Sequence, residues 1–240
     1  MKKRIMKKQT EEKKISNLKS QNSNIFLTFG AVMIKLADIL LLTALLLVGC
    51  AGQHEAVVLT GEEDFREGDL VLRCGYGAES RVVTETSQSI YSHIGILHYD
   101  TLTAQWNVVH AVPGEAEKGE PEYLKCEPLT DFYAPDRAVR GAWMRVDCPD
   151  SIAANAVRYA LQKVGEGVEF DNDYLLSDTT QIYCTELVWQ AYQHQGIDLS
   201  DQLRHEVPTL FSQDGECIFP CDIEKSSKIK YVQSFKTLRQ

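Results

Sequence analysis

The chain has 240 residues, of which 44% are hydrophobic and 25% are charged; this composition is typical of globular proteins and excludes a fibrous or wholly disordered chain. The first 49 residues hold nine Lys or Arg and three Asp or Glu, so residues 50–240 hold 16 basic and 31 acidic residues, a formal charge of −15. Such an acidic domain repels nucleic acid, so we expect no nucleic-acid partner.

The N-terminal region has the pattern of a bacterial lipoprotein signal. Charges at Lys35 and Asp38 interrupt the apolar stretch 25–48, and each is costly inside a bilayer. The uninterrupted part, residues 39–48, has ten residues, which is too short for a membrane-spanning helix but suits the core of a signal peptide.

The apolar stretch ends in Leu47-Val48-Gly49-Cys50, which resembles a lipobox, the motif whose cysteine receives lipid. We therefore expect a signal peptide over residues 1–49, with Met33 as an alternative start, and a membrane anchor at Cys50. Ala51 stands where Asp would indicate retention in the inner membrane, so the expected location is the cell envelope, on the periplasmic face of the outer membrane. Residues 50–64 are polar and predict a tether.

The next fifty residues predict one strand and a β-hairpin. The apolar run 70–72 follows turn residues and predicts a strand, and the polar residues 79–89 predict a loop. Two further strand patterns, at 92–99 and 105–111, are joined by a short polar segment and together predict a hairpin.

The second half of the chain predicts two helices and two more strands. Residues 114–122 predict a loop and residues 140–146 a strand. Asp150 is predicted to cap a helix that ends at Gly165 and Gly167, because apolar residues recur there at helical spacing. A second helix is predicted from Tyr183 to His194, and a last strand around 230–232. Residues 65–240 hold no Pro- or Gly-rich linker and are predicted to form one α+β domain.

Cys184 is the first candidate for chemistry. It lies at the N-terminal edge of the apolar face of the second predicted helix. The unpaired N–H groups and the positive dipole end of a helix stabilise an anion, so this position is expected to lower the pKa of a thiol toward neutrality. A buried cysteine that only packs in the core is the alternative.

A pair of histidines on the predicted hairpin favours the catalytic interpretation. If the hairpin turns about residues 101 and 102, His93 lies directly opposite His110 on one face. Two imidazoles at that separation can hydrogen-bond, one acting as a base and the other fixing its tautomer. A thiol, a base and an orienting group are the parts of a nucleophilic triad. His98 alternates onto the other face and is expected to be structural.

The remaining cysteines show no metal or redox motif. They are widely spaced and contain no CxxC pair, which favours buried cysteines that act as small hydrophobic residues. Cys217 and Cys221 are close enough in sequence to pair with each other or to share a metal, but no histidine lies beside them at ligand spacing. We expect no cofactor and no metal.

Several short motifs follow one another over about residues 65–235: Gly68-Asp69-Leu70-Val71, Ser92-His93-Ile94-Gly95-Ile96, Val108-Val109-His110-Ala111, Phe170-Asp171, Tyr183-Cys184-Thr185-Glu186-Leu187-Val188 and Pro220-Cys221-Asp222-Ile223. In order and spacing they resemble the permuted papain-like amidases of the YiiX/YaeF type, within the NlpC-like cysteine hydrolase superfamily. The resemblance implies a circularly permuted papain-like fold, in which an antiparallel sheet that carries the histidines packs on a helix that carries the cysteine.

The resemblance also implies residue roles. Cys184 is the nucleophile and His93 the general base, and His110 is the orienting third residue. The family commonly has a carboxylate at that third position, so His110 is a departure, for which the nearby Glu115 could compensate. The backbone N–H of Cys184 would contribute to the oxyanion hole. Tyr183 and Glu115 are candidate substrate-binding residues.

The leading hypothesis is a lipid-anchored cysteine hydrolase that opens an amide through a thioester intermediate. Its substrate would be a peptidoglycan stem peptide or another small amino-acid amide. Three alternatives stay open: an acyltransferase or lipid amidase, a non-catalytic ligand-binding module on the same fold, and a metal site made by His93, His110 and Cys184.

Overall fold

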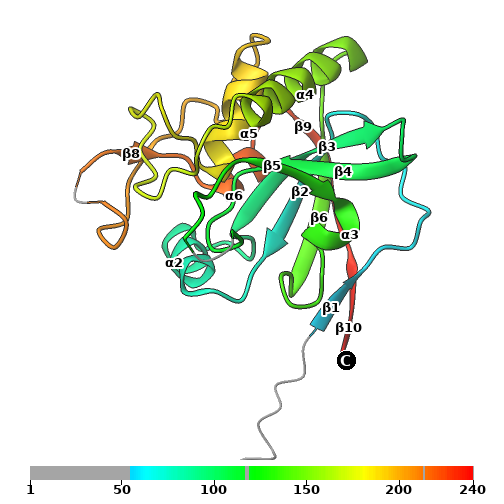
Figure 1. Ribbon diagram of the computed structural model, residues 1–240, viewed down its shortest axis with the longest axis horizontal. Helices are drawn as coiled ribbons and strands as arrows, with labels where there is room; N and C mark the ends of the chain where they lie inside the picture. Colours follow the sequence, from blue (N-terminus) through cyan, green and yellow to red (C-terminus); the bar gives the residue numbers. More distant parts are fainter. Residues whose placement is uncertain (1–54, 117–118, 213, 240) are drawn as a thin grey trace, which may run out of the picture. The chain divides into compact units, whose positions relative to one another are not determined.

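A computed structural model describes residues 55–116, 119–212 and 214–239, drawn in colour in Figure 1. They belong to one compact unit that runs from Gln53 to Gln240. The expected signal peptide and the expected lipidation site at Cys50 lie outside the described residues. Among the helices within the described ranges, none is both long and apolar enough to cross a membrane.

A six-stranded antiparallel sheet forms the centre of this domain. Its strands lie in the order β5-β4-β3-β2-β6-β9. Their bounds are Lys125–Pro128 for β5, Gln105–His110 for β4, His93–Asp100 for β3, Leu70–Cys74 for β2, Arg140–Val146 for β6 and Ile229–Ser234 for β9. Two short pairs complete the strands described: β1 (Glu55–Val58) with β10 (Lys236–Arg239), and β7 (His205–Glu206) with β8 (Glu216–Cys217).

The hairpin of β3 and β4 forms as the sequence predicts, but its register differs by two residues. Leu97 pairs with Val108, which places Gly95, and not His93, opposite His110. The turn has four residues, 101–104, instead of turning about 101 and 102. The two histidines are therefore diagonal neighbours, and they stay on the same face because a shift of two residues preserves the alternation of side chains.

Two helices cover one face of the sheet (Figure 1): α4 (Asp150–Gly165) and α5 (Cys184–Gln193). They contact each other and β3, and their apolar faces belong to the larger hydrophobic core together with Ile94 and Ile96. Both helices were predicted. Asp150 does not cap α4, however, because Pro149 occupies the N-cap position and Asp150 is the first helical residue.

The opposite face of the sheet carries a second apolar cluster. Val71, Leu97 and Val108 pack there against Phe132, which belongs to the short helix α3 (Leu129–Phe132). The side chains of His93 and His110 lie on this face, since they alternate in step with Leu97 and Val108 along their strands.

Helix α2 (Ala78–Ser87) replaces the loop predicted for residues 79–89. Its sequence is mostly polar and Val83 is the buried residue of the helix, so few apolar residues are present to indicate a helix. Near the C-terminus, helix α6 (Pro220–Glu224) begins with a capping box in which Asp222 accepts a hydrogen bond from the backbone N–H of Phe219.

The segment expected to be a tether, residues 50–64, includes part of the folded domain. Strand β1 pairs along its whole length with β10, and Ala56 is buried. Val57 and Leu59 pack against the second apolar cluster. Any free tether between Cys50 and the domain is therefore shorter than the sequence suggests.

This packing predicts that residues 55–64 stabilise the domain. A chain that begins at residue 65 should melt at a lower temperature than one that begins at residue 53, because it loses β1 and the burial of three apolar side chains. The loss should be roughly 2 to 3 kcal/mol, or roughly 5 to 10 °C in Tm. Thermal unfolding followed by circular dichroism measures the difference, and equal melting temperatures would show that β1 contributes nothing.

Candidate active site

Cys184 is the first residue of α5. The residue before it, Tyr183, has extended backbone (φ −93°, ψ 172°) and provides no side-chain cap, so the first N–H groups of the helix have no side-chain acceptor from the N-cap. Cys184 is 5% exposed, and its side chain borders a cleft that also exposes His93. Cys184 at the start of α5 and His93 at the start of β3 therefore line the same cleft.

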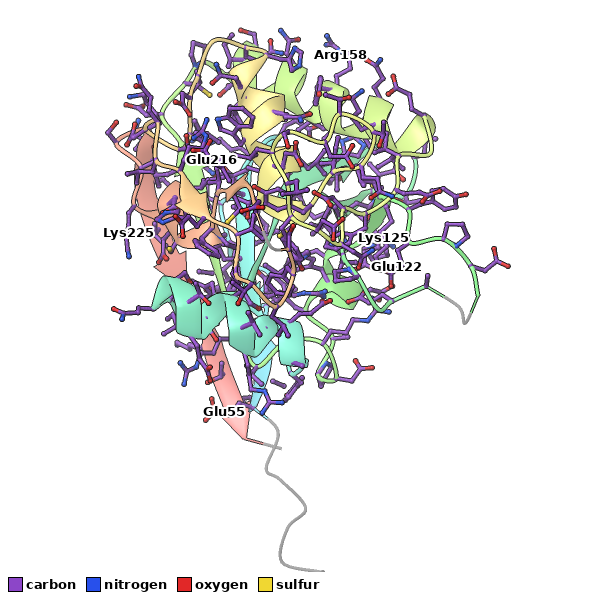
Figure 2. The ribbon with its side chains drawn as sticks, turned by 90° about the vertical axis from the view of Figure 1, so that its left-hand side faces the viewer. Glu55, Glu122, Lys125, Arg158, Glu216 and Lys225 are labelled. Atoms are coloured by element: carbon purple, nitrogen blue, oxygen red, sulfur yellow. The ribbon has the colours of Figure 1, made fainter. Side chains whose placement is uncertain are left out.

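The cleft has a volume of about 700 Å³. Four acidic and two basic residues line it, in addition to Cys184 and His93: Glu79, Glu115, Glu122, Asp136, Arg73 and Arg137. They come from β2, α2 and the loops beside β5 and β6. Figure 2 labels Glu122 and Lys125, the first residue of β5, near each other in that view.

The two histidines form a direct hydrogen bond, as the sequence predicts. His93 Nε2 lies 2.8 Å from His110 Nδ1. Both rings are buried and both contact the ring of Phe132, at centroid distances of 5.7 Å and 5.1 Å. Gly95 allows this packing, because a Cβ there would lie 2.4 Å from Cγ1 of Val108 and 3.1 Å from Cβ of His110.

Glu127 is the functional candidate that the sequence analysis missed. Its Oε1 lies 3.1 Å from His110 Nε2, so a carboxylate continues the row of hydrogen bonds beyond the second histidine. Its Oε2 accepts a hydrogen bond from Arg137 Nη1 at 2.9 Å and forms an ion pair with Lys125 Nζ at 2.9 Å. The alternation Lys125-Cys126-Glu127 was the available signal, but a strand of four residues that ends in proline is too short to recognise by pattern.

Glu115 does not take the part expected of it. It lines the cleft, but its carboxylate binds Arg73 at 2.5 Å, Lys125 at 2.5 Å and Arg137 at 3.1 Å, and Glu127 is the carboxylate that contacts His110. The carboxylate beside His110 is therefore that of Glu127 and not that of Glu115.

Tyr183 is a core residue and does not line the main cleft. It is 1% exposed, and its hydroxyl accepts a hydrogen bond from the backbone N–H of Ile218 at 2.9 Å. This contact ties the N-terminus of α5 to the segment before α6. Tyr183 therefore lies outside the cleft of about 700 Å³ and lines a smaller pocket that Cys184 also borders.

The thiol of Cys184 differs from the prediction. Burial raises its pKa above the ordinary value of 9.0, and this outweighs the lowering by hydrogen bonds from Thr185 and from the backbone N–H of Ile94. The same turn holds Glu186, whose pKa burial raises to about 8, so this carboxyl is neutral at pH 7 and adds no negative charge beside the thiol. The resting side chain of Cys184 is a neutral thiol.

The histidines are neutral as well. Burial lowers the pKa of His93 well below its ordinary 6.5, and the positive charge of Arg73 acts in the same direction. Burial also lowers the pKa of His110, to about 4, although the hydrogen bond with Glu127 raises it. Burial raises the pKa of Glu127, but His110 and Lys125 more than reverse this and hold it well below its usual range.

No group of three His, Cys, Asp or Glu side chains within the described ranges is arranged to hold a metal ion. His93 Nε2 and His110 Nδ1 face each other in a hydrogen bond, which does not favour the metal-site alternative. The six described cysteines are all free. Cys217 and Cys221 do not pair, since their sulfur atoms contact the backbone oxygens of Glu206 and Ser87.

Comparison with known proteins identifies the family of this chain. Residues 64–235 match the C92 family, described as permuted papain-like amidase enzymes of the YaeF/YiiX type. Among solved structures, the crystal structure of metalloprotein yiiX from Escherichia coli O157:H7 is similar, with a TM-score of 0.55 and 17% sequence identity. The match covers 73% of this chain and 97% of that chain, and at this identity it shows the fold alone. No curated protein gave a significant match. The chain therefore belongs to the permuted papain-like amidase family and is a cysteine hydrolase with an α+β fold.

Proposed function

We propose that Cys184 opens the amide bond of a small amide or peptide through a thioester intermediate, with His93 as the general base and His110 as the residue that orients it. One observation carries this proposal: Cys184 lines the same cleft as His93, whose Nε2 is held by His110 at 2.8 Å. With Nε2 so engaged, Nδ1 is the ring nitrogen of His93 that remains to accept a proton from the thiol.

The reaction then proceeds in two balanced halves. As the sulfur of Cys184 attacks the carbonyl carbon, its proton passes to Nδ1 of His93, and the carbonyl oxygen becomes an oxyanion. When the C–N bond breaks, His93 returns that proton to the departing amine, which leaves a thioester on Cys184. A water molecule then attacks the thioester, giving one proton to His93, and the carboxylic acid leaves as the thiol recovers its proton.

The N-terminus of α5 supports the oxyanion. Its first N–H groups have no side-chain cap, so the backbone N–H of Cys184 can donate to the developing negative charge. The positive end of the helix dipole acts in the same direction. Because thiol and imidazole are both neutral at rest, the transfer of the proton coincides with the attack and does not precede it.

The lining of the cleft supports a small substrate. A volume of about 700 Å³ suits a short peptide or an amino-acid amide. Among the described residues, Arg73 and Arg137 form ion pairs with Glu115, whereas Glu79, Glu122 and Asp136 form none. This charge balance favours substrates that carry an amino group, which both peptidoglycan stem peptides and small amino-acid amides can offer.

The lipobox-like sequence before Cys50 supports a lipid anchor in the bacterial cell envelope. The domain carries a strong negative charge and has little attraction for anionic lipid, so its concentration at a membrane would depend on acyl chains at Cys50. The outer membrane, facing the periplasm, is the location that Ala51 favours.

The roles of the three catalytic residues predict an order of effects. Cys184→Ser should abolish turnover with little change in Tm, because the substitution is nearly isosteric. His93→Ala should approach that loss, and His110→Ala should cost less, because it removes only the orienting partner. Steady-state hydrolysis of amino-acid amides measures these effects. His98→Ala is the matched control, since His98 lies on the same strand but hydrogen-bonds Glu67; retained turnover by Cys184→Ser would refute the assignment.

The raised pKa of Cys184 predicts how the thiol reacts with iodoacetamide. Since only the thiolate is nucleophilic, alkylation at pH 7 should be slower than that of an exposed thiol, and it should rise about tenfold per pH unit to beyond pH 9. Mass spectrometry of the peptide that holds Cys184 follows the rate, with Cys184→Ser as the blank. A rate that is already constant below pH 7 would show a preformed thiolate and contradict the neutral resting state.

The proposed anchor predicts a shift in mass and in location. Cys50→Ala should prevent lipid attachment and normal processing, and should move the protein out of the membrane fraction. Intact-mass measurement and membrane fractionation record both. A Cys50→Ala protein that still fractionates with the membrane, or a wild-type protein without added acyl mass, would contradict the anchor.

A further inference from the structure

The row of hydrogen bonds behind His93 ends in the carboxylate of Glu127, for which the proposed chemistry has no direct use. The row consists of His93 Nε2 to His110 Nδ1 at 2.8 Å and His110 Nε2 to Glu127 Oε1 at 3.1 Å. It crosses three adjacent strands. In each step the partners are diagonal, because His110 is opposite Gly95 on one side and Lys125 on the other.

Glu127 can only accept hydrogen bonds. Its pKa lies well below the usual range, so it is ionised at neutral pH. Its Oε2 is already occupied by Lys125 and Arg137, each at 2.9 Å, which fixes the orientation of the carboxylate. The contact of Oε1 with His110 therefore requires a proton on Nε2 of that ring.

The proton on Nε2 of His110 determines where the proton of His93 lies. A neutral imidazole carries one proton, so a proton on Nε2 of His110 leaves its Nδ1 as an acceptor. His93 must then donate from Nε2, and its own proton is thereby placed at Nε2. Nδ1 of His93 is left without a proton, which is the state a general base needs.

We infer that Glu127 is a positioning residue that sets the tautomers of both His110 and His93 and so makes His93 a base. The inference rests on the proposed function of His93. Two neutral imidazoles joined by one hydrogen bond can also adopt the reverse arrangement, in which His110 donates from Nδ1 and His93 carries its proton on the nitrogen that should receive one. The carboxylate of Glu127 selects the arrangement in which His93 donates to His110.

Glu127 also stabilises the positive charge that forms on His93 in the proposed reaction. When His93 takes the proton of Cys184, the new imidazolium lies two hydrogen bonds from a negative charge. Neutral His110 alone supplies a dipole, whereas Glu127 supplies the negative charge of a carboxylate whose side chain is largely buried, at 12% exposure. Arg73 and Lys125 oppose the cation, so the carboxylate offsets them.

Glu127→Gln tests the inference because it should reverse the row. Oε2 faces two cationic groups, Arg137, which donates a hydrogen bond to it, and the ammonium of Lys125, so the amide oxygen of a glutamine is expected on that side, with its NH₂ facing His110. The amide then donates to Nε2 of His110, which moves the proton of His110 to Nδ1 and that of His93 to Nδ1. With the accepting nitrogen blocked, kcat/KM should fall by about 10³- to 10⁴-fold, as expected for a base held in the wrong tautomer.

The direct readout is the tautomer of each ring in the resting full chain at pH 7. Long-range ¹H–¹⁵N NMR of protein labelled at histidine distinguishes Nε2–H from Nδ1–H, and His93→Ala and His110→Ala assign the signals. Both rings should be Nε2–H in the wild type and Nδ1–H in Glu127→Gln. Glu67→Gln is the matched control, since it alters the other carboxylate–histidine pair of this sheet, Glu67 with His98, at 2.8 Å; His93 and His110 should stay Nε2–H.

The inference is overturned if His93 carries Nδ1–H in the wild type, or if both rings remain Nε2–H in Glu127→Gln. The wild-type spectrum alone decides the matter should Glu127→Gln fail to fold. No substrate is present in this measurement, so its result is independent of whether Cys184 hydrolyses an amide. Retained turnover in Cys184→Ser would reject the proposed function and leave the tautomers of the row as they were found.

Discussion

The site depends on a buried row of polar side chains held across the sheet. His93, His110 and Glu127 come from three neighbouring strands, and each reaches the next only in the observed register. A shift of one residue in any of these strands would move its side chain to the other face, and a buried imidazole would lose its partner. Gly95 stands at the most crowded point of this arrangement, where a Cβ would collide with Val108. Close packing therefore requires glycine at position 95.

Burial gives this row its chemical character. Burial lowers the pKa of both histidines and raises that of Cys184, so the groups that exchange a proton in the proposed reaction start uncharged. An ion pair at rest would need stronger compensation than the helix N-terminus offers to a fully buried sulfur. In the proposed reaction, charge appears only as the bond is attacked, between the N-terminus of α5 and the carboxylate of Glu127, and both of these groups are in place before the substrate binds.

The sequence predicts which residues form this site better than it predicts the strand register and the contacts that join them. The period-two alternation of β3 and β4 places His93 and His110 on one face correctly, and the apolar face of α5 places Cys184 at its start. The register was wrong because it depends on the length of the turn, which composition does not determine. Helix α2 and strand β5 were missed, since one is mostly polar and the other is short. With β5 missing, Glu127 had no strand neighbour, and its role could not be inferred from sequence.

The proposed base, His93, and the proposed nucleophile, Cys184, reach the cleft by different kinds of contact. The row forms within 35 consecutive residues, 93–127, by pairing of neighbouring strands. Cys184 is brought to it by long-range packing of α5 on β3, through buried residues such as Leu187 and Ile94. The order of these elements along the chain does not matter to the chemistry, because α5 approaches β3 from the opposite face of the sheet wherever it is encoded. A permuted chain can therefore keep the geometry of a cysteine hydrolase. Changes in the packing of α5 would displace the thiol while the hydrogen-bonded row stays intact.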